Sequence, residues 1–181
     1  MGRLEIYMEL GLFLIQAVVG LLLMGHGAQK LFGWFGGYGI EGTGGFFEGS
    51  LGMRPGRLMA AAAGGAEFFG GLLLALGLAV PLAAVLIAST MFVAIRTAHR
   101  GKGLWVSDNG AELPLTYAVV AIGLAFNGAG QWSLDHAIGW DVAGLEWGLG
   151  ALAVAIVGAA GAIAFGHREH GAPVHGAPST S

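Results

Sequence analysis

The sequence contains no cysteine and few charged residues, and both shortages narrow what the protein can do. Without cysteine the chain has no thiolate nucleophile, no disulfide exchange and no thiolate ligand for zinc or an iron–sulfur cluster. Only 10% of its 181 residues are charged, whereas a soluble domain has about a quarter. The net charge is −3 and the basic residues form no block, so nucleic acid is not an expected partner.

Apolar residues are abundant instead, at 55% of the chain with a mean hydropathy of +0.72. Five apolar segments approach the roughly 20 residues that cross the hydrocarbon core of a bilayer. They lack the alternation of barrel strands, and lipid requires every backbone polar group to have an internal partner, so we predict helices. These spans cover about residues 10–32, 58–80, 82–99, 113–126 and 147–165. The sequence therefore predicts an all-α integral membrane helix bundle over residues 1–166, surrounded by the lipid bilayer, and a disordered cytoplasmic tail over residues 167–181.

Lysine and arginine are distributed unevenly between the two ends of this predicted bundle. With five spans, one end receives seven of the eight basic residues and the other receives only Arg3. The positive-inside rule then places the protein in the cell inner membrane with its N-terminus outside and its C-terminus in the cytoplasm. The seven residues are Lys30, Arg54, Arg57, Arg96, Arg100, Lys102 and Arg168.

Glu67 is the most informative single residue, because it lies inside the second apolar segment. It lies nine residues into the predicted helix, which places it on the order of 14 Å deep in the membrane at 1.5 Å per residue. A carboxyl group at that depth costs about 2.5–3.5 kcal/mol on insertion scales, and such groups usually face the bundle interior. Either it is protonated and hydrogen-bonded, or it pairs with a cation. Its role is either structural or in handling protons or a ligand.

Basic and polar residues from the other segments are expected at the same end of the bundle. His26 and Lys30 are four residues apart, so they share one helix face and are the natural partners of Glu67. We expect the first four helices to contribute to one intramembrane polar pocket. Its predicted members are Glu67, His26, Lys30, Gln29, Arg96, His99, Glu112 and Tyr117. No catalytic residue can be named from the sequence.

The loop after the first span is rich in glycine and aromatic residues. Residues 37–42 fit GxGxxG, but no strand precedes them and Glu41 would repel a phosphate, so no nucleotide site is predicted. Aromatic side chains suit the headgroup layer, and we expect Thr43 to cap a short helix that carries Phe47 and Leu51. We expect this loop to cover the polar pocket.

Histidine raises the possibility of haem or metal binding. Bis-histidine haem ligation needs two side chains at matched depth facing one cavity, whereas His26 and His99 both lie near the interface, so no haem is predicted. The predicted tail carries three further histidines that could bind a metal weakly, namely His167, His170 and His175. Because this tail is expected to be solvated, no bound metal is predicted there.

An ordered series of short motifs resembles the DoxX family of membrane proteins, from about Leu12 to Asp135. The series begins with residues 25–30 (GHGAQK), 35–37 (FGG), 42–43 (GT) and 46–47 (FF). It continues with Glu67 before Gly70-Gly71, His99 before residues 103–105 (GLW), Glu112, residues 128–130 (GAG) and residues 133–135 (SLD).

The resemblance implies a four-helix core, to which the segment at residues 147–165 would add a fifth transmembrane helix. It also implies an association with membrane redox metabolism, since the family name derives from subunits of a thiosulfate:quinone oxidoreductase, and hence quinone as a ligand. Two positions depart from the family pattern. Gln16 stands where members often carry Arg, and residues 128–130 replace the usual Gly-Pro-Gly.

Three functions follow from these observations. The first is a membrane subunit associated with redox or quinone-linked metabolism, which needs an oxidoreductase partner protein to supply a redox centre. The second is a proton-coupled small-molecule carrier, which is weakened because the sequence shows no inverted repeat. The third is a non-catalytic membrane scaffold, in which glycine stripes contact partner helices or form a homodimer.

Overall fold

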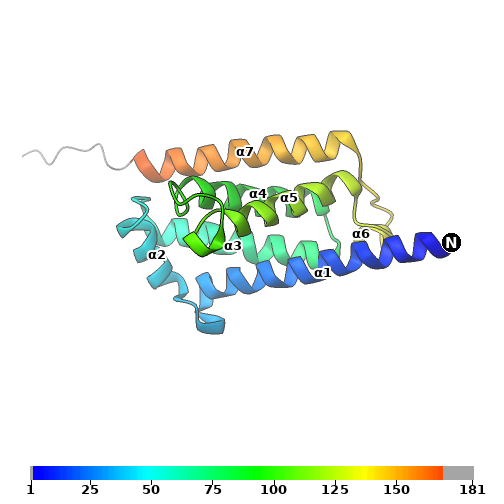
Figure 1. The fold of residues 1–181 in the computed structure, drawn as a ribbon, viewed down its shortest axis with the longest axis horizontal. Helices are drawn as coiled ribbons and strands as arrows, with labels where there is room; N and C mark the ends of the chain where they lie inside the picture. Colours follow the sequence, from blue (N-terminus) through cyan, green and yellow to red (C-terminus); the bar gives the residue numbers. More distant parts are fainter. Residues whose placement is uncertain (1, 169–181) are drawn as a thin grey trace, which may run out of the picture.

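The computed structural model describes residues 2–168, and this part of the chain folds into helices without any strand (Figure 1). The helices are α1 (Arg3–Phe32), η1 (Trp34–Gly36), α2 (Gly39–Gly49), α3 (Gly56–Leu76), α4 (Val80–Arg96), η2 (Val106–Asp108), α5 (Glu112–Asn127), α6 (Leu134–Ala137) and α7 (Leu145–His167). The predicted all-α bundle is confirmed, and the fifth apolar segment is a helix, α7, that packs on α4 and α5. His167, the first residue of the predicted tail, belongs to α7, and residues 169–181, which hold most of that predicted tail, lie outside the described part.

The five long helices run along one common axis, with the N-terminus at one end and the last turn of α7 at the other (Figure 1). Helices α1, α3 and α7 are long and apolar enough to cross a membrane, whereas α4 and α5 are apolar but shorter, at 17 and 16 residues. The end at which α1, α4 and α7 finish carries seven of the eight basic residues.

Large apolar side chains cover the outside of this bundle. On α1, Leu14 and Val18 are 51% and 53% exposed, and on α7 Val157 is 70% exposed. Such exposure would be costly in water but suits acyl chains. The helices, their composition and this apolar exterior make the chain a multi-pass membrane protein.

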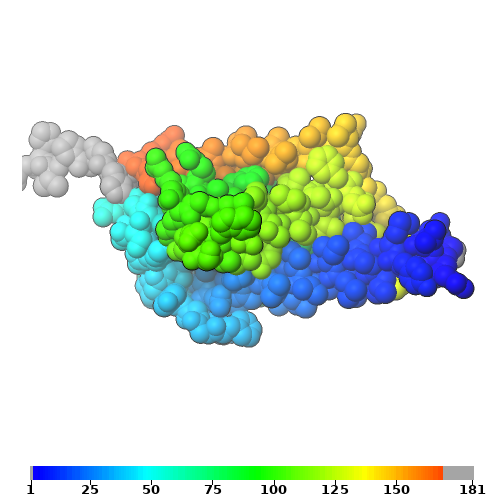
Figure 2. Space-filling model, viewed as in Figure 1, coloured from blue at the N-terminus to red at the C-terminus, as the bar shows by residue number. Residues whose placement is uncertain are grey.

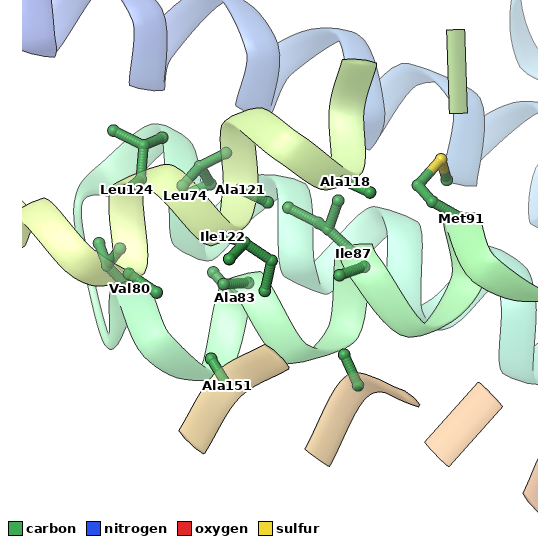
Figure 3. Close-up of a cluster of buried hydrophobic side chains, with 14 of the residues drawn as sticks. Leu74, Val80, Ala83, Ile87, Met91, Ala118, Ala121, Ile122, Leu124 and Ala151 are labelled. Carbon is green, nitrogen blue, oxygen red and sulfur yellow. The ribbon is translucent and has the colours of Figure 1, made fainter. Parts of the chain in front are cut away.

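Helix α4 forms the centre of the bundle, packed against α3, α5 and α7. Its inward residues Ala83, Ala84, Ile87 and Ala88 are fully buried. Figure 3 shows Ala83 and Ile87 in this buried cluster. Alanine predominates at these contacts, so the helix backbones approach closely, as is common where lipid supplies no hydrophobic driving force between helices.

The junction between α3 and α4 differs from the predicted boundary. Helix α3 ends at Leu76, because Gly77 adopts a left-handed conformation with φ of 58°. Pro81 lies in the first turn of α4, where its missing N–H is tolerated. Asp135, which is 1% exposed, accepts hydrogen bonds from the N–H groups of Ala79 (2.8 Å) and Val80 (3.3 Å). This carboxylate therefore caps the N-terminus of α4, where the helix dipole favours negative charge.

The prediction that Thr43 caps a short helix is wrong. Helix α2 begins at Gly39, so Thr43 lies inside it. The Thr43 hydroxyl group instead donates to the carbonyl oxygen of Lys30 at 3.4 Å. The residue fastens α2 to the end of α1, since its side chain is used between helices rather than at a helix terminus.

Helices α1 and α3 pack through glycine in an antiparallel register. A Cβ atom on Gly27 would lie 2.6 Å from the carbonyl oxygen of Gly64, and one on Gly71 would lie 2.5 Å from that of Gly20. The two contacts are two helical turns apart on both helices. No larger residue fits at these positions without moving a backbone, so glycine fixes both the distance and the register of the two helices.

This packing predicts different effects for two neighbouring substitutions in α1. Gly27→Ala forces a methyl group into the α3 backbone, so we expect a loss of about 1–3 kcal/mol in the free energy of unfolding, measured in mixed detergent micelles. Gly25→Ala is the matched control, because no atom lies within 4 Å of its added Cβ. Equal stability of the two variants would contradict the close approach of α1 and α3.

Candidate functional site

A buried ion pair joins α1 to α3 near the basic end of the bundle. The Lys30 ammonium group donates to Oε2 of Glu67. The Glu67 side chain is 4% exposed, and that of Lys30 is 28% exposed. A carboxylate this deep is stable only when it is paired and hydrogen-bonded, and Lys30 satisfies both conditions.

The glycine register explains why these two side chains meet. Gly27 faces Gly64, so Lys30 lies one turn nearer the end of the bundle and Glu67 one turn deeper. The offset along the axis is about 9 Å at 1.5 Å per residue. Helical side chains lean toward the N-terminus of their own helix, and α1 and α3 run in opposite directions. Lys30 therefore leans inward and Glu67 outward, so the two long side chains close the gap.

The pair borders a cavity of about 230 Å³, here called the polar cleft, between α1, α4, α5 and the loop after α4. Figure 2 shows α5 and this loop lying against α1 on the same face of the molecule. The cleft is lined by Leu23, His26, Lys30, Glu67, Met91, Ala94, His99, Val106, Asn109, Gly110, Leu113, Pro114 and Tyr117. Five of the eight residues predicted for an intramembrane pocket thus border one cavity.

His26 of α1 and Tyr117 of α5 lie next to each other in the lining of the cleft. Their ring centroids are 6.1 Å apart in an edge-to-face arrangement. Nδ1 of His26 is 3.2 Å from Oε1 of Gln29, and the Gln29 amide group donates to the carbonyl oxygen of Phe35 at 3.3 Å. Gln29 does not border the cleft but orients the His26 ring, because its amide oxygen can accept a hydrogen bond from Nδ1–H.

The loop after α4 brings His99 into the cleft. Nδ1 of His99 lies 2.7 Å from the carbonyl oxygen of Asn109, which can only accept, so Nδ1 carries the proton and Nε2 is an acceptor in the neutral ring. Glu112 accepts a hydrogen bond from the Val106 N–H at 2.9 Å and so fastens this loop rather than bordering the cleft.

Arg96 does not reach the cleft. It is the last residue of α4, is exposed and is absent from the cleft walls. Eight residues that border it were not predicted from the sequence, among them Asn109 and Pro114. Asn109 has a left-handed backbone with φ of 59°, which an Asp-Asn-Gly turn signal could have indicated.

Gln16 lies away from the ion pair, beyond the end of α3. It is 2% exposed, and its amide nitrogen donates to the carbonyl oxygen of Ala129 at 2.8 Å. Gly77 packs against its side-chain oxygen. The position at which family members often carry Arg therefore holds the turn after α5 and does not contact Glu67.

The cleft offers hydrogen-bond donors to a ligand's oxygen atoms. The Lys30 ammonium group has three N–H donors and uses one of them in its hydrogen bond to Glu67. The Tyr117 hydroxyl group can donate or accept a hydrogen bond. Within residues 2–168, no three His, Asp or Glu side chains gather in a way that would hold a metal ion. The donor set suits carbonyl, phenolate or carboxylate oxygens.

The fold and the buried ion pair define a class, the multi-pass helical membrane proteins with a charged pair between their helices. The DoxX family model matches residues 11–100, and the chain belongs to the DoxX family. This match covers α1 to α4 and thus both members of the ion pair.

Two relatives extend the match beyond that region. An uncharacterized protein of Haemophilus influenzae is 32% identical over 139 residues, which are 75% of this chain and 96% of that protein. A Bacillus subtilis protein named "Putative oxidoreductase CatD" is 32% identical over 127 residues, which are 70% of this chain and 86% of that protein. No solved structure matches the chain significantly.

The ion pair predicts strongly non-additive effects on stability. Lys30→Met leaves a buried carboxylate without its cation, so we expect a loss of about 3 kcal/mol in the free energy of unfolding. The double variant Lys30→Met with Glu67→Gln removes that uncompensated charge and should recover most of the loss. The measurement is a double-mutant cycle in mixed detergent micelles.

Arg57→Met is the control for this cycle. Arg57 pairs with Glu41 at 2.8 Å, but both side chains are 70% exposed, and exposed pairs contribute little. We expect no measurable change. If the double variant is as unstable as Lys30→Met alone, Lys30 and Glu67 do not interact as a buried pair.

Proposed function

We propose that the protein is a membrane subunit of a redox assembly and that its polar cleft binds the head group of a quinone. The observation that carries this proposal is the buried Lys30–Glu67 pair, which faces His26 and Tyr117 across one cavity. The name of the Bacillus subtilis relative, which calls that protein an oxidoreductase, supports it.

The chemistry of a quinone matches the groups in this cleft. Quinone oxygens accept hydrogen bonds, and the Lys30 ammonium and Tyr117 hydroxyl groups are donors. Reduction of a quinone to a quinol takes two electrons and two protons. A partner oxidoreductase supplies the electrons, since hard redox chemistry rests on a cofactor. The chain's own part is to orient the head group and to hold protons on Glu67 or His26 beside its oxygens.

A tail-less benzoquinone tests the head-group site. We expect it to raise the thermal unfolding temperature of the purified protein, because it binds the folded state only. Glu67→Gln removes the carboxylate that holds the Lys30 ammonium group beside the cleft, and it should weaken this binding on the order of tenfold, as expected when one charge-assisted contact is lost.

Glu41→Gln is the matched control, since Glu41 is exposed, lies in the first turn of α2 and does not border the cleft. It should bind the probe like the wild type. If the wild type shows no stabilisation, or if Glu67→Gln binds equally well, the quinone proposal fails. A carrier would then be sought by solute uptake into proteoliposomes.

The orientation is part of the same proposal. We place the basic end of the bundle in the cytoplasm and the N-terminus on the outer side of the inner membrane. The charge distribution supports this arrangement, because Arg3 is the single basic residue at the opposite end.

A cysteine-free chain makes this orientation directly testable. Ser107→Cys lies in the loop after α4, and Ile138→Cys follows α6 at the opposite end, where Ile138 is 65% exposed. A membrane-impermeant thiol reagent should label Ile138→Cys in intact cells. It should label Ser107→Cys only after the membrane is permeabilised. The reverse labelling pattern would show that the protein has the opposite orientation in the membrane.

A further inference from the structure

A second cavity borders the Lys30–Glu67 pair from another direction. It has a volume of about 370 Å³ and lies toward α2 and α7, which do not border the polar cleft, whereas the cleft lies toward α5. We call it the apolar cavity. Four residues border both spaces, namely Lys30, Glu67, Ala94 and His99. The ion pair is therefore a common wall of the two.

Small residues on α3 and α7 create the room in this cavity. Ala62 and Ala66 lie one turn apart on α3, and Gly158 and Ala162 lie one turn apart on α7. Helix α4 contributes Ala94 to the shared wall, one of the smallest side chains available. Larger residues at these positions would fill the space, since helix interfaces in membranes normally pack without voids.

The walls of the apolar cavity suit a hydrocarbon chain. The hydroxyl groups of Thr90 and Thr97 donate to carbonyl oxygens of their own helix, at 3.0 and 2.7 Å. Phe47 and Met53 add apolar surface from α2 and the segment that follows it. Beyond the ion pair and His99, the lining therefore offers few groups that would need a polar partner.

The apolar cavity reaches the exterior on the lipid-facing side of the bundle. Phe46, Ala62 and Gly158 are wall residues that are themselves exposed. At the basic end the segment after α2 closes against α7, since the Arg54 N–H donates to the carbonyl oxygen of Gly166 at 2.8 Å. The opening thus lies beside acyl chains, from which a long apolar molecule can enter.

We infer that the apolar cavity binds the hydrophobic tail of the ligand whose head group occupies the polar cleft. The ligand is then a single-chain amphiphile with a hydrogen-bond-accepting ring, held across the Lys30–Glu67 pair. Ligand pockets generally have volumes of about 300–1,000 Å³, so the polar cleft alone is small and the two spaces together are adequate. This inference rests on the proposed quinone site and specifies that the quinone carries a long tail.

Photolabelling in liposomes tests where the tail lies. The probe is a benzoquinone with an alkyl chain that ends in a diazirine, used on the full chain with lipid in excess as the competing environment. We expect labels on α3, α4 and α7 at residues 62–66, 89–97 and 158–162. Both an unlabelled long-chain quinone and the tail-less benzoquinone should suppress them, because head and tail belong to one ligand.

Ala162→Phe fills the apolar cavity without touching the polar cleft. It should reduce labelling at these positions about tenfold, because the ring occupies the space of the chain, and leave binding of the tail-less benzoquinone unchanged. Ala160→Phe is the matched control, since Ala160 is exposed on α7 and borders neither space. Ala63→Leu on the opposite wall serves if Ala162→Phe does not fold.

The outcomes separate this inference from the proposal beneath it. If the tail-less benzoquinone binds but the diazirine labels the exposed apolar face of α1, the tail lies in lipid and the inference is overturned while the head-group site stands. Equal labelling of the Ala162→Phe and Ala160→Phe variants has the same consequence. If the tail-less benzoquinone does not bind the wild type, the proposed function fails and the tail site fails with it.

Discussion

A charged carboxylate inside an apolar bundle needs a partner of opposite charge, and the pairing of Glu67 with Lys30 organises the structure around this residue. The chain supplies Lys30, and it brings the two together through the glycine contacts between α1 and α3 rather than through the polar groups themselves. The small residues thus have an electrostatic consequence. They set the register in which two oppositely directed helices lean their charged side chains toward each other.

The polar residues around this pair fall into two roles. His26, His99 and Tyr117 border the cleft, whereas Gln29 and Glu112 hold other groups in place. Such supporting hydrogen bonds matter because a binding site needs fixed rotamers. Hydrogen bonds from residues outside the polar cleft therefore hold the groups that line it in fixed positions.

The sequence predicted the helices and the position of Glu67 inside the bundle because both follow from one-dimensional rules. Span length, the absence of alternation and the cost of a buried charge need no knowledge of packing. The sequence could not predict that Arg96 would miss the cleft, since the rotation of a helix end depends on its neighbours. Nor could it predict that Asp135 would cap α4, because the two are far apart in sequence and meet only once α6 folds back. Thr43 was misread for the same reason, as its partner is a carbonyl group on another helix.

The bundle is built from helices of unequal length, and this bears on the membrane around it. Helix α1 has 30 residues, whereas α5 has 16, or about 24 Å at 1.5 Å per residue. A typical hydrocarbon core is about 30 Å thick, so a helix of this length is accommodated by local thinning of the bilayer or by flanking residues that reach toward the head groups. Thinning beside α5 would bring lipid head groups and water closer to the flank on which the polar cleft lies, and so shorten the distance between the aqueous phase and the Lys30–Glu67 pair.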